Sequence, residues 1–175
     1  ALRVDPLDEA CREWNEKALL PVGYECNNLF LTDWDETDFG ELDFYDLFDV
    51  FYPQIYHRKI PWQSGENAGN STVYGIPSKE FESVIQKFLN VKTDILRKKT
   101  IYREKDDTYE YYPRGFYESE YPEHPYPEVT AFQENDDGTV TLTVHAVFPY
   151  LGSSRALVHE VTVRPMENSA AAVRY

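Results

Sequence analysis

The chain has 175 residues, of which 42% are hydrophobic and 15% aromatic, and its net charge at pH 7 is −14. A chain of this length buries roughly 70% of its unfolded surface, so we expect a single domain over residues 1–175. The negative charge repels phosphate backbones and argues against nucleic acid as a partner. No stretch reaches the roughly 20 consecutive apolar residues that a membrane-spanning helix needs.

Acidic residues concentrate between Lys17 and Arg58, where the sequence contains no lysine or arginine. Nine of them lie there: Glu25, Asp33, Asp35, Glu36, Asp38, Glu41, Asp43, Asp46 and Asp49. Such a run is typical of a solvated face, although it could also attract cations or a basic partner. A calcium loop needs oxygen ligands at its odd positions and glycine at position 6. Loops starting at Asp33 or Asp35 place aspartate at position 6 or phenylalanine at position 5, so we predict no metal site.

The first part of the chain predicts helices. The first helix begins at Asp5 and ends near Leu20, where proline and glycine follow. The second begins at a capping box, Asp38-x-x-Glu41, and ends at Pro53, because proline removes a helical hydrogen bond and clashes with the preceding turn.

Two further helices and a hairpin follow. Ser78 caps the third helix, and Thr93 begins a short fourth one. Residues 54–75 between the second and third helices are polar and rich in turn residues, which predicts a mobile loop. The runs Ile101–Arg103 and Thr108–Tyr112 predict two paired strands.

The C-terminal part predicts an antiparallel meander. The run Val140–Phe148 alternates apolar and mostly polar residues, which is typical of a half-buried strand. Similar runs lie on either side, over residues 128–134 and 156–164, and a last short strand is expected over residues 171–175. The fold class is therefore α+β, with N-terminal helices packed on a C-terminal β-meander. A cone-shaped arrangement like that of the nuclear-transport-factor-2 superfamily is one form it could take, by analogy of element order alone.

Strand alternation also predicts which residues face each other. Setting Glu134 opposite Thr139 places Glu128 opposite His145 on the polar face. On the next pair of strands, His159 falls opposite Val144 on the core face, so we expect a buried histidine with a hydrogen-bond partner.

Chemical motifs are sparse. The sequence has no nucleophile elbow, no phosphate-binding glycine loop and no closely spaced zinc ligands, so we predict no cofactor and assign no catalytic residue. The pair Glu128 and His145 is an acid–base arrangement in principle, which leaves a hydrolase as the alternative function. The aromatic residues fill the core or form a surface that stacks on a ligand. Our candidate binding residues are Trp62, Tyr121, Tyr126, Glu128 and His145.

The two cysteines are Cys11 and Cys26. A disulfide between them is geometrically feasible and would indicate an oxidising compartment, whereas free thiols would not exclude one. We expect both thiols to be free.

Several segments resemble an uncharacterised family of secreted lipoproteins from Gram-positive gut bacteria: Ile76–Glu82, Tyr126–Val129, Asp137–Val144 and His159–Pro165. The resemblance rests on strands and helix caps, not on catalytic residues. It implies export and attachment to the cell surface by a lipid on a cysteine upstream of Ala1, and it implies no activity. The main functional expectation is a surface binding module for a small ligand, glycan, peptide or protein. A purely structural domain of a larger cell-envelope protein is a further alternative.

Overall fold

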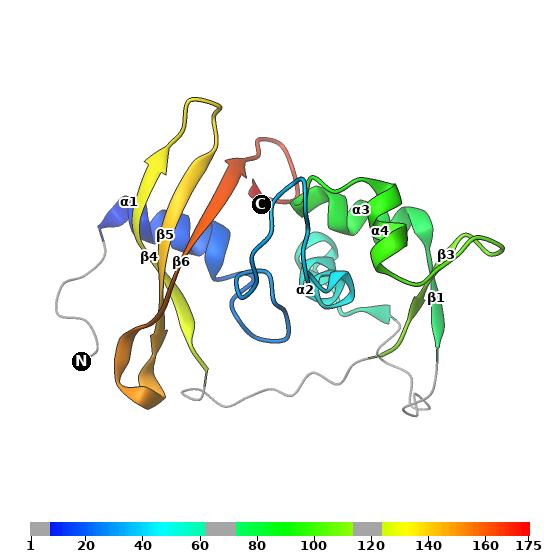
Figure 1. Cartoon of the computed structure of the whole chain (residues 1–175), viewed down its shortest axis with the longest axis horizontal. Helices are drawn as coiled ribbons and strands as arrows, with labels where there is room; N and C mark the ends of the chain where they lie inside the picture. Colours follow the sequence, from blue (N-terminus) through cyan, green and yellow to red (C-terminus); the bar gives the residue numbers. More distant parts are fainter. Residues whose placement is uncertain (1–7, 62–72, 114–123) are drawn as a thin grey trace.

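The computed structural model describes residues 8–61, 73–113 and 124–175. It has an α+β fold with mostly N-terminal helices and C-terminal strands, as predicted (Figure 1). In chain order the elements are α1 (Glu9–Trp14), the π-helical segment η1 (Asn15–Leu19), α2 (Phe44–Tyr56), β1 (Tyr74–Pro77), α3 (Ser78–Phe88), α4 (Thr93–Lys99), β2 (Tyr102–Arg103), β3 (Thr108–Tyr111), β4 (Tyr126–Glu134), β5 (Val140–Phe148), the 3-10 turn η3 (Pro149–Leu151), β6 (Ser153–Pro165) and β7 (Val173–Arg174).

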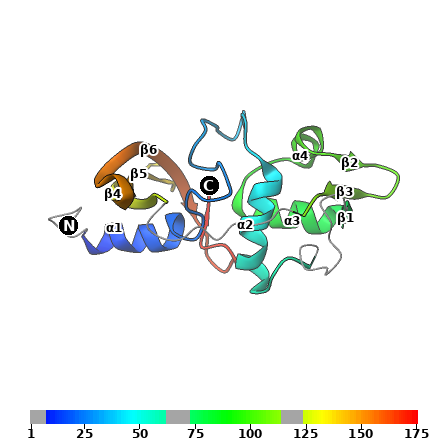
Figure 2. The ribbon, with the colours of Figure 1, turned by 90° about the horizontal axis from the view of Figure 1, so that it is seen from below.

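The strands form two antiparallel sheets at opposite ends of the molecule (Figure 1). The smaller sheet has the order β1-β3-β2 and lies with α2, α3 and α4; we call this group the helical half. The larger sheet has the order β4-β5-β6-β7 and curls over α1 (Figure 2); we call α1, η1 and β4–β7 the meander half. Strand β1 was not predicted, because its sequence falls in the stretch expected to be a loop.

One continuous cluster of buried side chains links the two halves. In the helical half it consists largely of stacked rings, with Phe51 on Phe88 at 4.1 Å between centroids and Phe48 on Phe81 at 5.1 Å. Tyr175 joins the halves: its hydroxyl donates to the carbonyl of Ala18 in η1 (2.6 Å) and its backbone N–H donates to the carbonyl of Phe88 in α3 (2.8 Å). Many of the aromatic residues therefore serve the core.

Three helix boundaries differ from the prediction. Helix α1 begins after Asp8, whose carboxylate accepts a hydrogen bond from the N–H of Cys11 (2.8 Å). Helix α2 begins after Asp43, whose carboxylate accepts from the next two N–H groups of the helix, so Asp38 is not its cap. Pro53 lies inside α2 and does not end it. The lost hydrogen bond is offset by burial of the ring of Tyr52, which is fully inaccessible to solvent.

The register of β4 on β5 is correct at one end and wrong at the other. Glu128 lies opposite His145 as predicted, but Glu134 lies opposite Val140 and not Thr139. A β-bulge at Thr130 causes the shift, since it adds one residue to β4.

The bulge has a packing reason. It turns Phe132 onto the face of Leu142, where its ring meets Trp14 of α1 at 6.4 Å. Just before the bulge, the side-chain oxygen of Asn15 accepts the N–H of Val129 (3.1 Å), so η1 seals this edge of the sheet. The register of β5 on β6 is as predicted, with Val144 opposite His159.

Candidate binding groove beside strand β6

The residues singled out from the sequence fall into two groups. Trp62 and Tyr121 lie outside the described residues. Tyr126, Glu128 and His145 come together on β4 and β5, with Glu128 directly opposite His145. All three side chains are partly buried. Hydrolase activity that uses this acid–histidine pair stays a prediction.

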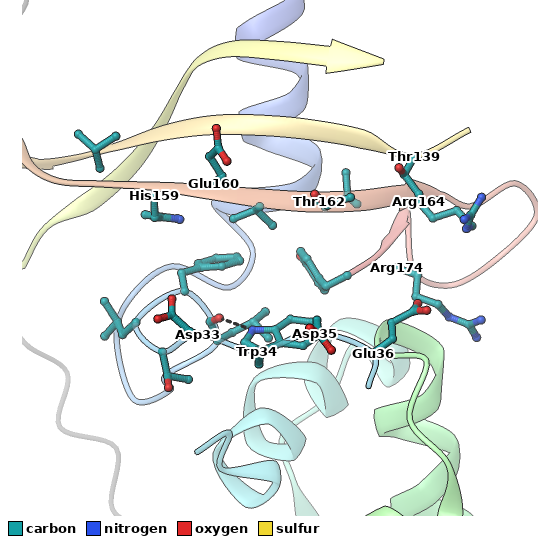
Figure 3. Close-up of a pocket in the computed structure, with 18 of the residues that line it drawn as sticks. Asp33, Trp34, Asp35, Glu36, Thr139, His159, Glu160, Thr162, Arg164 and Arg174 are labelled. Atoms are coloured by element: carbon teal, nitrogen blue, oxygen red, sulfur yellow. Dashed lines mark hydrogen bonds between the residues drawn. The ribbon is translucent and has the colours of Figure 1, made fainter. Parts of the chain in front are cut away.

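A larger feature lies on the other side of the sheet. A groove of about 830 Å³ runs between β6 and the segment Leu29–Glu36, which precedes α2 (Figure 3). Its volume falls within the range of about 300–1,000 Å³ that is usual for ligand sites. One wall is a strand and the other is a loop, so the groove is elongated along β6.

The strand wall is an open sheet edge. Strand β7 pairs with β6 only at Arg164 and Pro165. Over the remaining stretch, Ser153–Val163, no strand in the described part of the chain pairs with the outer edge of β6. Along an antiparallel edge, alternate residues direct their backbone N–H and C=O groups outward. Leu157 and Val158 on this stretch are each 41% exposed.

The loop wall is held in a fixed conformation. The indole N–H of Trp34 donates to the carbonyl of Leu29 (2.9 Å), and the carboxylate of Asp35 accepts from both the N–H and the hydroxyl of Thr37. These hydrogen bonds hold the pKa of Asp35 below its usual value. Gly40 has φ +49°, and a Cβ there would lie 2.6 Å from the carbonyl oxygen of Asp33, so only glycine fits.

His159 forms part of the groove's floor. It has a hydrogen-bond partner, as predicted, but its side chain is partly and not fully buried. Its side chain points toward the loop, whereas Glu160 points away from it (Figure 3). The Nε2 atom lies 2.7 Å from the hydroxyl of Tyr24, and the ring stacks on Phe30 at 5.7 Å. Burial lowers the pKa of His159 to about 4, so the ring is neutral at pH 7. The floor is therefore aromatic and uncharged.

Charge is distributed unevenly around this floor. The loop wall carries the carboxylates of Asp33, Asp35 and Glu36, all exposed. Arg164 and Arg174, opposite each other on β6 and β7, lie together at one end of the groove (Figure 3). Figure 3 shows Glu36 near Arg174 at this end and Asp33 farther along the loop, so a ligand that matches this pattern carries a positive group toward Asp33 and a negative group toward the arginines.

Other kinds of site find less support. In the three described ranges, no group of His, Cys, Asp and Glu side chains could hold a metal ion. Within the same ranges, no helix is long and apolar enough to cross the hydrophobic part of a bilayer. Cys11 is buried and Cys26 is exposed, and no disulfide joins them.

Comparison with known proteins gives one match. The model of a family of unknown function, DUF6070, matches residues 1–173. The chain belongs to this DUF6070 family. No curated protein and no solved structure matches it. Membership brings no activity with it, and the cone-shaped likeness considered above stays a prediction.

The sequence analysis missed this groove, although the sequence carried two signals for it. In Ala156-Leu157-Val158 the alternation of β6 breaks into consecutive apolar residues, which indicates a strand without a fully solvated face. The acidic run was recognised, but nothing in the sequence places it beside β6, more than a hundred residues away.

Proposed function

We propose that this member of the DUF6070 family is a binding module, tethered outside the cell, that takes an extended peptide segment of a partner protein along β6. The observation that carries the proposal is the open edge of β6 over Ser153–Val163, of which residues 157–163 line a groove with a hydrogen-bonded loop as its opposite wall. An extended peptide can add to such an edge as a further strand, using main-chain hydrogen bonds for affinity and side-chain contacts for specificity.

The size and shape of the groove favour a peptide strand. The open stretch accommodates a strand of about six residues, the usual strand length in proteins. The segment Leu29–Glu36 lies across the groove from this edge and bounds the space that a ligand strand would fill.

The charges favour a peptide with a basic residue. Asp33 and Glu36 form no ion pair or side-chain hydrogen bond with any other residue that the structure describes, so both carboxylates are available to a ligand. A lysine or arginine on the ligand strand would meet them. A glycan has less to recognise, because most of the large aromatic side chains in the described ranges are buried in the core and do not form a stacking platform.

Binding to a random hexapeptide array, with a glycan array in parallel, tests the proposal. We expect wild-type protein to select peptides, and Leu157→Asp to weaken that binding about tenfold or more by placing a charge on the strand wall. The matched control is Leu151→Asp, because Leu151 is 65% exposed on η3 and does not line the groove. Selection of glycans only, or equal loss in both variants, contradicts the proposal.

Backbone methylation of a selected peptide tests the binding mode. A strand that adds to β6 uses the N–H of every second residue, so N-methylation should weaken binding about tenfold at alternate positions only. A uniform effect along the peptide would exclude strand addition. Light scattering at the same concentrations checks whether a second copy of the chain occupies the edge in place of the peptide.

The extracellular location rests on the resemblance to secreted lipoproteins described above. Protease treatment of intact cells that express the full-length precursor tests it, with a cytosolic protein as control. Digestion of the module in intact cells, and its recovery in the membrane fraction of untreated cells, are the expected results. Protection in intact cells would contradict the location without affecting the peptide site.

A further inference from the structure

Two arginines lie opposite each other at one end of the groove. Arg164 and Arg174 are direct partners across β6 and β7. Opposed residues of antiparallel strands share a face, and like charges in such a pair are destabilising. An anion bound between the two guanidinium groups would offset this repulsion.

Both guanidinium groups retain hydrogen-bonding capacity. Arg174 donates from Nη2 to the carbonyl of Gln86 (2.7 Å), whereas its Nε is buried and has no hydrogen-bond partner among the described residues. Arg164 donates from Nη1 to the carbonyl of Asp137 (2.9 Å), and its Nη2 lies 3.9 Å from the carboxylate of the same residue. Each guanidinium has five N–H donors, so each keeps some for a ligand beyond these bonds, apart from the buried Nε of Arg174.

The position of β7 places the arginines at the point where a bound strand must end. β7 occupies the outer edge of β6 at Arg164 and Pro165. A peptide lying along Ser153–Val163 must therefore end or turn away where β7 begins. The arginines stand at that point, so the group they meet belongs to the end of the ligand strand.

We infer that Arg164 and Arg174 form a subsite for the C-terminal carboxylate of the bound peptide. The inference rests on the proposed peptide-binding function. A carboxylate matches the planar fork of a guanidinium and accepts two parallel hydrogen bonds from it. Because β6 runs toward Arg164, a peptide with its carboxyl end there lies parallel to β6. The ligand is thus the extreme C-terminus of a partner protein and not an internal segment.

Two matched hexapeptide libraries test the subsite, one with free C-terminal acids and one with C-terminal amides. We expect wild-type protein to bind the acids at least about tenfold more tightly. In Arg164→Gln and in Arg174→Gln, acids and amides should bind equally. Arg12→Gln is the control, since Arg12 is an exposed residue of α1 that does not line the groove, and it should retain the preference for acids.

The outcomes separate the subsite from the function on which it rests. Equal binding of both libraries to wild-type protein overturns the subsite and leaves peptide binding intact. Preference for amidated peptides with an internal aspartate also overturns it, since the carboxylate then comes from a side chain. Failure of both libraries to bind removes the peptide-binding function itself. Arg164→Gln keeps the test decisive if Arg174→Gln unfolds, because the Arg164 side chain is half exposed.

Discussion

The two sheets of this protein differ in how many of their polar groups are paired within the chain. On the smaller sheet, side-chain hydroxyls and charges have partners within the chain: Tyr109 donates to Glu82 (2.8 Å), Tyr111 donates to Asp49 (2.6 Å), and Arg103 pairs with Glu110 at 2.6 Å. Beside the larger sheet, the groove exposes carboxylates, arginine donors and a strand edge. The polar side chains of the smaller sheet are thus paired within the chain, whereas several of those beside the larger sheet are exposed in the groove.

This difference shows how one core can hold the groove in shape while the surface of the groove stays exposed. The stacked rings of the helical half tolerate little change, because interiors are close-packed. The wall formed by Leu29–Glu36 is anchored to that core through Trp34, which stacks on Phe39. The groove is therefore held in shape from the helical half, while its own surface remains free for a ligand. The predictions that follow test this division.

The largest expected effect comes from removing a stacked ring. Phe51 is fully buried and lies between Phe88 and Tyr175. Phe51→Ala should lower the free energy of unfolding by about 3–5 kcal/mol, because the protein loses the transfer free energy of the ring and is left with a cavity in its core. Urea denaturation followed by tryptophan fluorescence measures it. Tyr150→Ala is the control, since Tyr150 is 70% exposed, and a similar loss there would contradict the division.

The next effect concerns pH in the helical half. Burial raises the pKa of Asp49 to about 7, and one of its carboxylate oxygens has no hydrogen-bond partner among the described residues. This folded-state pKa lies above the unfolded value of about 3.9, so the folded chain holds the proton of Asp49 more tightly than the unfolded chain does. The stability that this proton binding contributes is present at low pH and is lost as pH rises toward 7. The loss is on the order of 4 kcal/mol.

Asp49→Asn removes that titration. We expect the variant to lack the fall in stability that ionisation of Asp49 causes in the wild type between pH 5 and pH 8. Denaturation midpoints across the pH series measure the difference. Parallel curves for the two proteins would show that Asp49 is already ionised in the folded state at pH 5.

The meander half should respond to pH in the opposite direction. The pKa of His159 is lowered by burial to about 4, below its unfolded value of about 6.5. The unfolded chain therefore binds a proton before the folded chain does, and stability falls as pH drops from about 6.5 toward 4. We expect a loss of about 2 kcal/mol, allowing for the part of the ring that solvent reaches.

His159→Gln separates this effect from that of Asp49. Glutamine can still bond to the hydroxyl of Tyr24 but does not titrate, so the loss below pH 6.5 should disappear while the loss above pH 5 remains. The same denaturation series tests it. If the variant still loses stability below pH 6.5 as the wild type does, another group causes the acid sensitivity.

The smallest effect belongs to a surface ion pair of the smaller sheet. Arg103, with its side chain 42% exposed, pairs with Glu110. Arg103→Gln should change stability by about 0–1 kcal/mol, because water screens such pairs. The measurement is the same urea series. A loss comparable to that of Phe51→Ala would show that surface charges contribute to the helical half far more than its core packing suggests.

The sequence predicted the elements that depend on local pattern. The alternation of Val140–Phe148 identified β5 and its register with β6, and it placed His159 opposite Val144. Local signals failed where tertiary packing decided the outcome. Pro53 was expected to end α2, but the helix continues to Tyr56 because the aromatic residues around the proline are buried. The bulge at Thr130 had a sequence signal, since Val129 and Phe132 are apolar at positions of opposite parity.

The candidate groove was beyond local reasoning. Its two walls are far apart in the sequence, and only the folded chain places Asp33 and Glu36 beside β6. The like-charged pair Arg164 and Arg174 also depends on how the turn after β6 brings β7 back. Of the binding residues chosen from the sequence, Glu128 and His145 do meet, because they lie on a single hairpin whose register the alternation determines.

The two outer strands of the larger sheet also limit how this protein can assemble with itself. On β4, Pro127 lacks an N–H group, the N–H of Val129 is bonded to Asn15, and the bulge at Thr130 distorts the backbone. Growth of a cross-β filament requires two receptive edges on every copy, and in the described part of the larger sheet only β6 is receptive. Concentrated solutions should therefore form pairs joined through β6, and not filaments that grow from the larger sheet.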